Sequence, residues 1–257
     1  MTAQVHVIVP VRGDAAFLAS ALDSLRAQVD ADWRATLLPV GDAARHAAQA
    51  QAGERIHVYT GNDADEAHGL ARLLDACDSA HACILDGDDM LEAHALRSLL
   101  DALQADPAAG MAYSRHVLVD VAGRVLGPGP LCELPYSPDA LLLDCMTGPL
   151  RLLRRDALRV AGGYPLDAGD AAYYDLCLRL SELAPVAHVP LPLYRRRIHP
   201  QAPEVARWAE GIEARYAAFQ RAVARRGLDA HYDCALEIDS WHVLQPRKPF
   251  GGWGQPR

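Results

Sequence analysis

Short apolar runs alternate with amphipathic stretches through the first hundred residues of the chain. The apolar runs predict strands at 5–11, 35–40, 56–60 and 82–85. Between and after them, apolar side chains recur at helical spacing, which predicts helices beginning near Phe17 and spanning 43–52, 67–77 and 91–103. Strands and helices that alternate in this way indicate an α/β fold, with a mostly parallel sheet and helices on both faces.

The pattern changes after Pro107. A hairpin is predicted from 111–120 and 124–126, and Ser137 is expected to cap a helix that ends at Cys145. The remaining predicted elements are a strand at 150–153, helices at 156–161 and 171–183, strands at 186–189 and 193–198, and helices at 202–226 and 233–244. The tail from 245 to 257 is rich in Gly, Pro and Arg and is expected to be flexible.

Composition narrows the class of protein without choosing a function. The chain has 257 residues, of which 51% are hydrophobic, so it can bury a proper core. A net charge of −8 argues against a nucleic-acid partner, which needs a basic face. The six cysteines include no CxxC pair and suggest small buried side chains in a reducing compartment. Because the sequence contains neither a signal-peptide pattern nor a membrane-spanning apolar run, we expect a cytoplasmic protein, and peripheral contact with a membrane surface stays open.

An acidic turn follows the fourth predicted strand and reads Asp86-Gly87-Asp88-Asp89. Three carboxylates in four residues repel one another, and a hard divalent cation relieves that repulsion. Mg²⁺ and Mn²⁺ prefer oxygen ligands and usually share them with substrate phosphates. Ligands of such sheets bind at the carboxyl ends of the strands, where this turn lies. The alternative is a polar turn in which Asp88 or Asp89 caps the next helix.

Five segments in order resemble the family-two inverting glycosyltransferases, which have the GT-A (Rossmann-like) fold. They are VHVIVPVRGDAAFLASALDSLRAQ, ILDGDDMLEAHAL, RLLRRDALRVAGGY, DLCLRL and VPLPLYRRRIHP, and they extend over roughly residues 5–201. The resemblance implies transfer of a sugar from a nucleotide-diphosphate donor, with Mg²⁺ or Mn²⁺. It divides the chain into a nucleotide-sugar-binding half (1–106), an acceptor-side half (107–201), C-terminal helices (202–244) and the tail (245–257).

The resemblance also assigns roles by position. Asp86 and Asp88 would hold the metal, with Asp89 beside them, and His199 would approach the metal or the diphosphate. The residues that would border the nucleotide are Pro10, Val11, Arg12, Asp14, Asp42 and Asp86. The arginines at 195–197 would form either a basic lip that receives phosphate or a solvated, acid-paired face.

The sequence departs from the family pattern at three places. The second strand ends in Gly41-Asp42 instead of Asp-Asp-Gly-Ser, and the segment 62–69 lacks the usual Arg-Asn. The position of the general base holds Tyr173, a poor base at neutral pH. Asp170 and, after it, Asp175 are the candidate substitutes, although Asp175 is also spaced to pair with Arg179.

Two functions of different class follow from these departures. One is an active glycosyltransferase, acting in glycan, cell-envelope or capsule synthesis on a glycan, lipid-linked or protein acceptor. The other is a catalytically impaired relative that binds a nucleotide sugar or a partner protein. A nucleotidyltransferase is a weaker reading, because Pro10 to Gly13 contains a single glycine where such folds usually carry a glycine-rich loop. The acceptor is expected to contact residues 124–148.

Overall fold

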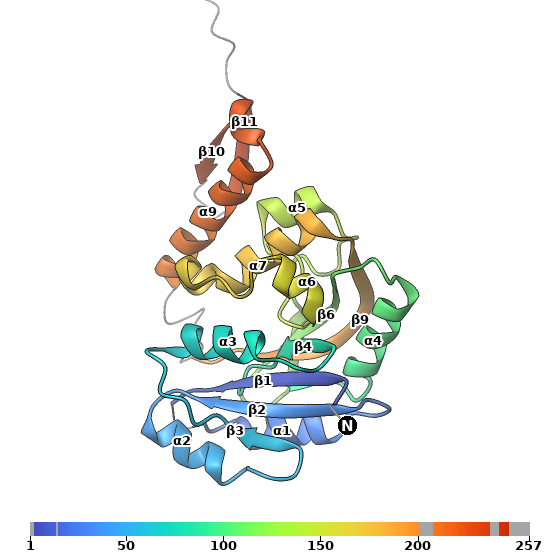
Figure 1. Cartoon of the computed structure of the whole chain (residues 1–257), viewed down its shortest axis with the longest axis vertical. Coiled ribbons are helices and arrows are strands. Elements are labelled where there is room, and N and C mark those ends of the chain that lie inside the picture. The colour runs from blue at the N-terminus through green and yellow to red at the C-terminus, as the bar shows by residue number, and fades with distance from the viewer. Residues whose placement is uncertain (1–2, 14, 201–207, 237–241, 247–257) are drawn as a thin grey trace, which may run out of the picture.

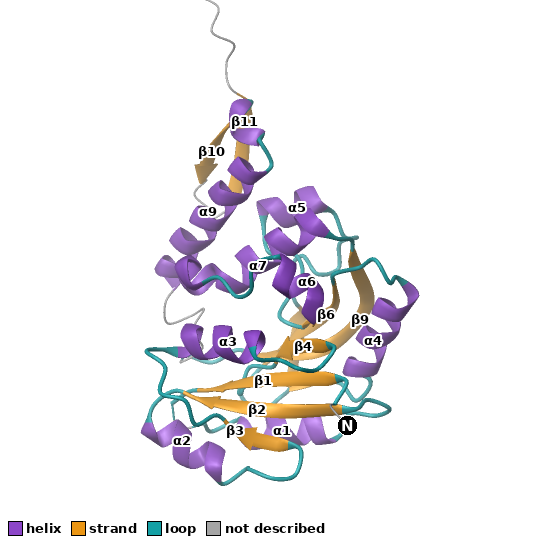
Figure 2. Ribbon diagram, viewed as in Figure 1, coloured by secondary structure: helices purple, strands orange, loops and turns teal. Residues whose placement is uncertain are grey.

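The computed structural model describes residues 3–13, 15–200, 208–236 and 242–246. Asp14, one of the expected nucleotide-binding residues, and the segment 247–257 lie outside the described residues. Within the described part, one mixed sheet carries helices on both faces, and a C-terminal helix with a small hairpin projects from it (Figures 1 and 2).

The main sheet has the strand order β3-β2-β1-β4-β8-β6-β9-β5, and β7 pairs with β6 at its side. Its strands are β1 Val5–Val11, β2 Trp33–Pro39, β3 Ile56–Val58, β4 His81–Ile84, β5 Met90–Leu91, β6 Met111–Val119, β7 Val125–Pro128, β8 Arg151–Arg154 and β9 Val186–Arg197. The pairs from β3 to β4 are parallel, as is β6 with β9, whereas β8 runs antiparallel to both of its neighbours. The helices are α1 Leu18–Arg26, α2 Asp42–Gln49, α3 Glu66–Asp75, α4 Ala95–Ala105, α5 Pro138–Leu143, α6 Arg155–Val160, α7 Ala172–Leu183 and α9 Trp208–Arg225, with the 3-10 turns η1 Leu166–Ala171 and η2 Leu228–Ala230.

Two apolar cores cover the two faces of the sheet. Alternate side chains of a strand point to opposite faces, so Val7 and Val9 of β1 pack toward α1 and α4 while Ile8 packs toward α3. The second core also takes in α7 and the buried side of α9 through Leu176 and Phe219. The continuous apolar run of β1 thus reflects burial on both faces, as in other parallel strands.

The region after Pro107 differs from expectation in one strand. The two strands predicted at 186–189 and 193–198 form the single strand β9, which pairs with β6 throughout. The register shifts between Ser114 and His116, where β9 carries Pro190 and Pro192. A proline has no N–H for the ladder, so the strand passes these residues with an irregularity instead of ending. The hairpin predicted after Met111 is confirmed, with Gly123 at φ +81° in its turn.

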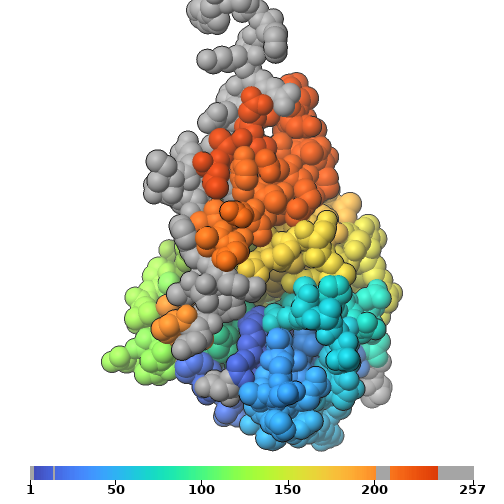
Figure 3. Space-filling model, turned by 90° about the vertical axis from the view of Figure 1, so that its left-hand side faces the viewer, coloured from blue at the N-terminus to red at the C-terminus, as the bar shows by residue number. Residues whose placement is uncertain are grey.

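The C-terminal extension corrects a second prediction. A helix was expected at 233–244, but β10 (Tyr232–Leu236) and β11 (His242–Pro246) form an antiparallel pair, which also includes Gln245 of the expected tail. The spacing of apolar residues after Tyr232 is compatible with a helix and with a strand. Pairing with a second strand decides between these conformations. Tyr216 of α9 donates its hydroxyl to the Cys234 carbonyl at 3.0 Å and ties β10 to the helix. Figure 3 shows this orange and red extension above the yellow segment around α7. None of the helices in the described part combines the length and apolar character needed to cross a bilayer.

Candidate functional site

The carboxyl ends of β1, β2 and β4 meet at one edge of the sheet. The parallel register places Pro10 beside Leu38, and the Gly87 N–H donates to the Pro10 carbonyl at 3.1 Å. A Cβ on Gly87 would lie 2.7 Å from that carbonyl oxygen, so the close approach of the two chains requires glycine in the acidic turn. Pro10 and Val11 are buried here, and the acidic turn is held directly over the end of β1.

Arg12 organises the first group of charges at this edge. Its guanidinium contacts Glu66 through two hydrogen bonds of 2.6 and 2.5 Å and Asp86 Oδ1 through a third of 3.0 Å. Burial opposes the charge of Arg12, but the carboxylates of Asp86 and Glu66 outweigh it and raise the pKa of the guanidinium. Arg12 therefore remains a cation, and it neutralises part of the acidic turn.

Asp88 and His199 form the second group. His199 Nε2 lies 2.8 Å from Asp88 Oδ2, and the imidazole also packs on Phe17, with 5.3 Å between the ring centres. These residues are 111 positions apart in the sequence, and the end of β9 brings them together. The fold thus brings His199 to the acidic turn, and its expected approach to a metal or a diphosphate stays a prediction.

Asp89 anchors the turn from beneath. It is 4% exposed and accepts hydrogen bonds from the Tyr194 hydroxyl at 2.6 Å and from the Arg197 N–H at 2.7 Å. Burial, together with the neighbouring Asp86 and Asp88, raises the pKa of Asp89 well above its usual range. Its role in the structure is to fix the turn against β9.

The arginines at 195–197 do not act as one basic lip. Arg195 pairs with Glu92 at 2.5 Å. Arg197 is buried and donates to the carbonyls of Asp88, Asp120 and Val121 at 2.8–3.1 Å. The acid-paired alternative therefore holds for Arg195, and Arg197 holds the backbone of the turn in place.

A cavity of about 270 Å³ lies beyond the ends of β2 and β3. Asp42, at the start of α2, lines it together with Arg45, Tyr59 and Asp63, and Glu66 lines its border toward Arg12. Tyr59 donates its hydroxyl to Asp63. Glu66 connects this largely polar cavity to the charges at the edge of the sheet, because it also binds the guanidinium of Arg12.

The two candidate bases occupy different surroundings. Asp170 is exposed in η1, the turn that precedes α7. Asp175 is 3% exposed and forms ion pairs with Arg179 (3.2 Å), Arg221 (3.3 Å) and Arg225 (3.7 Å). The expected pairing with Arg179 is confirmed, and the ion pairs of Asp175 join α7 to α9. We therefore retain Asp170 alone as the candidate base.

Tyr173 packs its ring against a buried arginine. The guanidinium carbon of Arg151 lies 4.4 Å from the ring centre, and the Tyr173 hydroxyl donates to the Arg151 carbonyl at 3.4 Å. Burial raises the pKa of Tyr173 well above its usual range, although Arg151 opposes the shift. The phenol is neutral at physiological pH and cannot accept a proton as a base.

A divalent cation at this edge of the sheet would need oxygen or nitrogen ligands from the acidic turn and its neighbours. The described residues contain no group of three His, Cys, Asp or Glu side chains arranged to hold a metal, because Asp86 turns to Arg12 and Asp89 is used beneath the turn. Asp88 and His199 do fit a two-ligand site: ligands in an octahedral shell with bonds of about 2.1 Å lie about 3 Å apart. The expected set of Asp86, Asp88 and His199 stays a prediction: Asp88 and His199 lie close enough to share an ion, whereas Asp86 faces Arg12.

The sequence did not predict that Glu66 and Arg151 belong to the candidate site. Glu66 stands 54 positions from Arg12, and no spacing rule connects them. The sequence offered one indirect signal for Glu66. Arg12 follows β1 close to an acidic turn, and a partly buried arginine there favours a second carboxylate as a partner. Arg151 gave no signal, since arginine is usually exposed.

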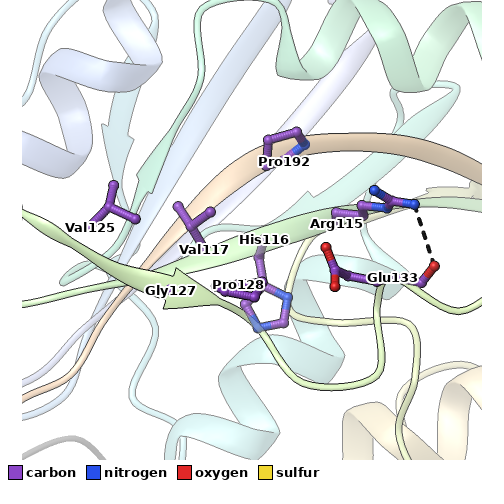
Figure 4. Close-up of a pocket in the computed structure, with 8 residues that line it drawn as sticks. All are labelled: Arg115, His116, Val117, Val125, Gly127, Pro128, Glu133 and Pro192. Carbon is purple, nitrogen blue, oxygen red and sulfur yellow. Dashed lines mark hydrogen bonds between the residues drawn. The ribbon is translucent and has the colours of Figure 1, made fainter.

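A second cavity, of about 350 Å³, lies in the region after Pro107 (Figure 4). It is formed by β6, β7 and the following loop, with Val125, Pro128 and Glu133 in its wall and His116 at its base. Burial, with Arg196 and Arg151, lowers the pKa of His116 to about 4, so the imidazole is neutral at pH 7.

Comparison with known proteins places the fold. No family model matches the chain, and no curated protein sequence matches it. Among solved structures, S. aureus TarS in complex with UDP-GlcNAc has a TM-score of 0.65 at 13% identity, over 87% of this chain and 66% of that chain. TarS in complex with UDP has a TM-score of 0.60 at 14% identity, over 85% and 65%. The mannosyltransferase PcManGT from Pyrobaculum calidifontis, in complex with GDP-Man and Mn²⁺, has a TM-score of 0.55 at 16% identity, over 90% and 76%.

These likenesses concern the fold. The chain spans just under two thirds of the two TarS chains with bound ligands. The mixed α/β architecture with a mostly parallel sheet agrees with these glycosyltransferase structures, and the expected GT-A fold is confirmed.

Proposed function

We propose that the protein is a glycosyltransferase that uses a nucleotide-diphosphate sugar and a divalent cation. The observation that carries the proposal is the pairing of Asp88 with His199 at the carboxyl edge of the sheet, beside Arg12. This arrangement offers two ligands for Mn²⁺ or Mg²⁺ and one cation for a diphosphate. The fold shared with TarS and PcManGT supports the proposal. The structures of those proteins contain UDP, UDP-GlcNAc, or GDP-Man with Mn²⁺.

The donor would lie along the edge of the sheet. Its base would enter the cavity that Asp42 lines, and its diphosphate would meet Arg12 and the pair of Asp88 with His199. Pro10, Val11 and Asp86 border this path, and Asp14 is proposed as a further contact. A bound divalent cation would neutralise charge on the leaving diphosphate.

Transfer would be of the inverting type. The acceptor oxygen attacks the anomeric carbon, the bond from that carbon to the phosphate oxygen breaks, and the hydroxyl proton passes to Asp170. Asp170 is proposed because Tyr173 is neutral and Asp175 is committed to three arginines. The cavity with His116 at its base is a proposed acceptor groove, since it lies on the half assigned to the acceptor.

The alternative function is donor binding without turnover. The neutral Tyr173 at the base position is the observation that favours it. The two functions predict the same donor affinity and differ in turnover, so binding is measured first.

Calorimetric titration with UDP and GDP, in Mn²⁺ and in chelator, tests the proposal. We expect one of the two to bind at least tenfold more tightly with Mn²⁺, and Asp88→Ala to remove that difference. Asp156→Ala is the matched control, because its side chain is 85% exposed on α6 and is expected to keep the metal dependence. Equal affinities of the wild type in Mn²⁺ and chelator would refute the metal role.

A further inference from the structure

Arg151 is a buried cation without a counter-ion in the described structure. It is 4% exposed, its Nε donates to Thr147 Oγ1 at 2.8 Å, and its Nη2 donates to Cys145 Sγ at 2.9 Å. The face of Tyr173 covers the guanidinium. Among the described residues, no carboxylate forms an ion pair with Arg151, and its Nη1 makes no hydrogen bond.

This arrangement is energetically unfavourable in the free protein. Removing a charge from water costs several kcal/mol unless it is paired and hydrogen-bonded. Arg197, equally buried, meets the requirement with three backbone carbonyls. Arg151 has only a hydroxyl, a thiol and a ring face, and these neutral groups offset the cost in part.

The position of Arg151 places it at the edge where the donor would bind. Ala82 of β4 lies opposite Leu153 of β8, and the two strands are antiparallel. Arg151, the first residue of β8, therefore lies toward the carboxyl end of β4, from which the acidic turn follows. Tyr164 lies within the electrostatic influence of Arg151 and of the group formed by Arg12, Glu66 and Asp86, and its hydroxyl makes no hydrogen bond with a described residue.

We propose that Arg151 receives the carboxylate of an acidic sugar, either the sugar transferred or the acceptor. The proposal rests on the proposed function and specifies its substrate class. A carboxylate fits because it supplies the single negative charge that Arg151 lacks among the described residues, and its oxygen could accept a hydrogen bond from Nη1. The aspartate that the family resemblance expects at the position of Tyr173 would itself neutralise Arg151, so the tyrosine leaves the cation available.

Matched pairs of ligands that differ in one carboxylate test this inference by calorimetry in Mn²⁺. The donor arm compares UDP-glucuronic acid with UDP-glucose and GDP-mannuronic acid with GDP-mannose. The acceptor arm compares methyl glucuronide with methyl glucoside, in the presence of saturating UDP or GDP. We expect the acidic member to bind at least tenfold more tightly in one arm, and that arm identifies the source of the carboxylate.

Variants separate recognition from folding. Arg151→Met should abolish the preference for the acidic ligand and leave the affinity for UDP or GDP unchanged. Tyr173→Asp keeps the arginine, supplies an internal carboxylate and should abolish the preference as well, whereas Tyr173→Phe should retain it. Nucleotide binding without any preference in either arm overturns the inference and spares the proposed function. Failure of both UDP and GDP to bind overturns both.

Discussion

At the scale of single residues, the site consists of charges whose partners come from distant parts of the chain. Arg12 joins Glu66 to Asp86, and His199 contacts Asp88. The segments after β1 and β9 and the start of α3 supply one residue each, and the turn after β4 supplies both aspartates. Arg12 neutralises the charge of Asp86, and we propose the pair of Asp88 and His199 as the group that contacts a ligand.

His199→Ala tests the contact with the diphosphate. A lost charge-assisted or metal contact is worth about 1.5–3 kcal/mol, which corresponds to roughly a ten- to hundred-fold loss of affinity. We expect this loss for UDP or GDP, whichever binds, and almost no change for the corresponding nucleoside.

Calorimetric titration of both ligands measures the difference, with His231→Ala as the control at an exposed histidine near the C-terminal hairpin. Equal losses for nucleotide and nucleoside would mean that His199 supports the structure of the site without contacting phosphate.

The sequence predicted part of this residue-level picture. Asp86, Asp88 and His199 could be named because strand ends and the family resemblance point to them. The ion pair of Arg12 with Asp86 could not be predicted. Arg12 also binds Glu66, and the fold places Glu66, the first residue of α3, beside it. Burial of Arg151 likewise follows from the packing of β8 beside α7 and has no local signature.

At the scale of elements, periodicity predicted the Rossmann-like half well and the C-terminal part less well. The first four strands lie within two residues of their predicted bounds, because short runs rich in apolar residues between helical stretches favour strands of a parallel sheet. β9 and the β10–β11 pair were harder: two prolines within a strand mimic a break, and a short apolar segment fits both periods. In both cases, a partner strand distant in sequence decides the conformation.

Asp175→Asn tests the contact between α7 and α9. The side chain is 4% exposed and faces Arg179, Arg221 and Arg225, so its loss leaves arginines without their shared carboxylate. Breaking a buried ion pair costs about 3–5 kcal/mol, and the partial exposure of Arg221 and Arg225 places this variant near the lower figure.

Chemical denaturation measures the unfolding free energy, and nucleotide titration serves as the second reading. We expect lower stability with unchanged nucleotide affinity. A stable variant that loses turnover instead would return Asp175 to the list of catalytic residues.

At the scale of the whole molecule, stability should depend on pH through buried histidines. His6 of β1 is 5% exposed, with Nε2 2.8 Å from Thr36 Oγ1, and burial lowers its pKa from 6.5 to about 4. Because the pKa of His6 is lower in the folded state than in the unfolded chain, the unfolded chain binds the proton first as pH falls. The contribution of His6 is therefore complete above pH 6.5 and is lost as pH falls toward 4.

The difference in pKa corresponds to about 3 kcal/mol as an upper figure. Urea unfolding at several pH values should thus give a steeper loss between pH 6.5 and 4 for the wild type than for His6→Gln. Parallel curves for the two proteins would show that His6 does not contribute to the pH dependence. His116 titrates in the same direction and remains in both proteins.

The proposed function of the whole molecule is the transfer of a sugar from a nucleotide donor. The most direct measurement follows release of UDP or GDP from the acidic and neutral donors named above, with Mn²⁺ and a mixture of glycoside acceptors. We predict release that requires acceptor and Mn²⁺, that disappears in Asp88→Ala, and that falls by roughly a hundredfold or more in Asp170→Asn with donor affinity retained. Donor binding without any release in the wild type would contradict the claim and leave the protein as a nucleotide-sugar-binding relative.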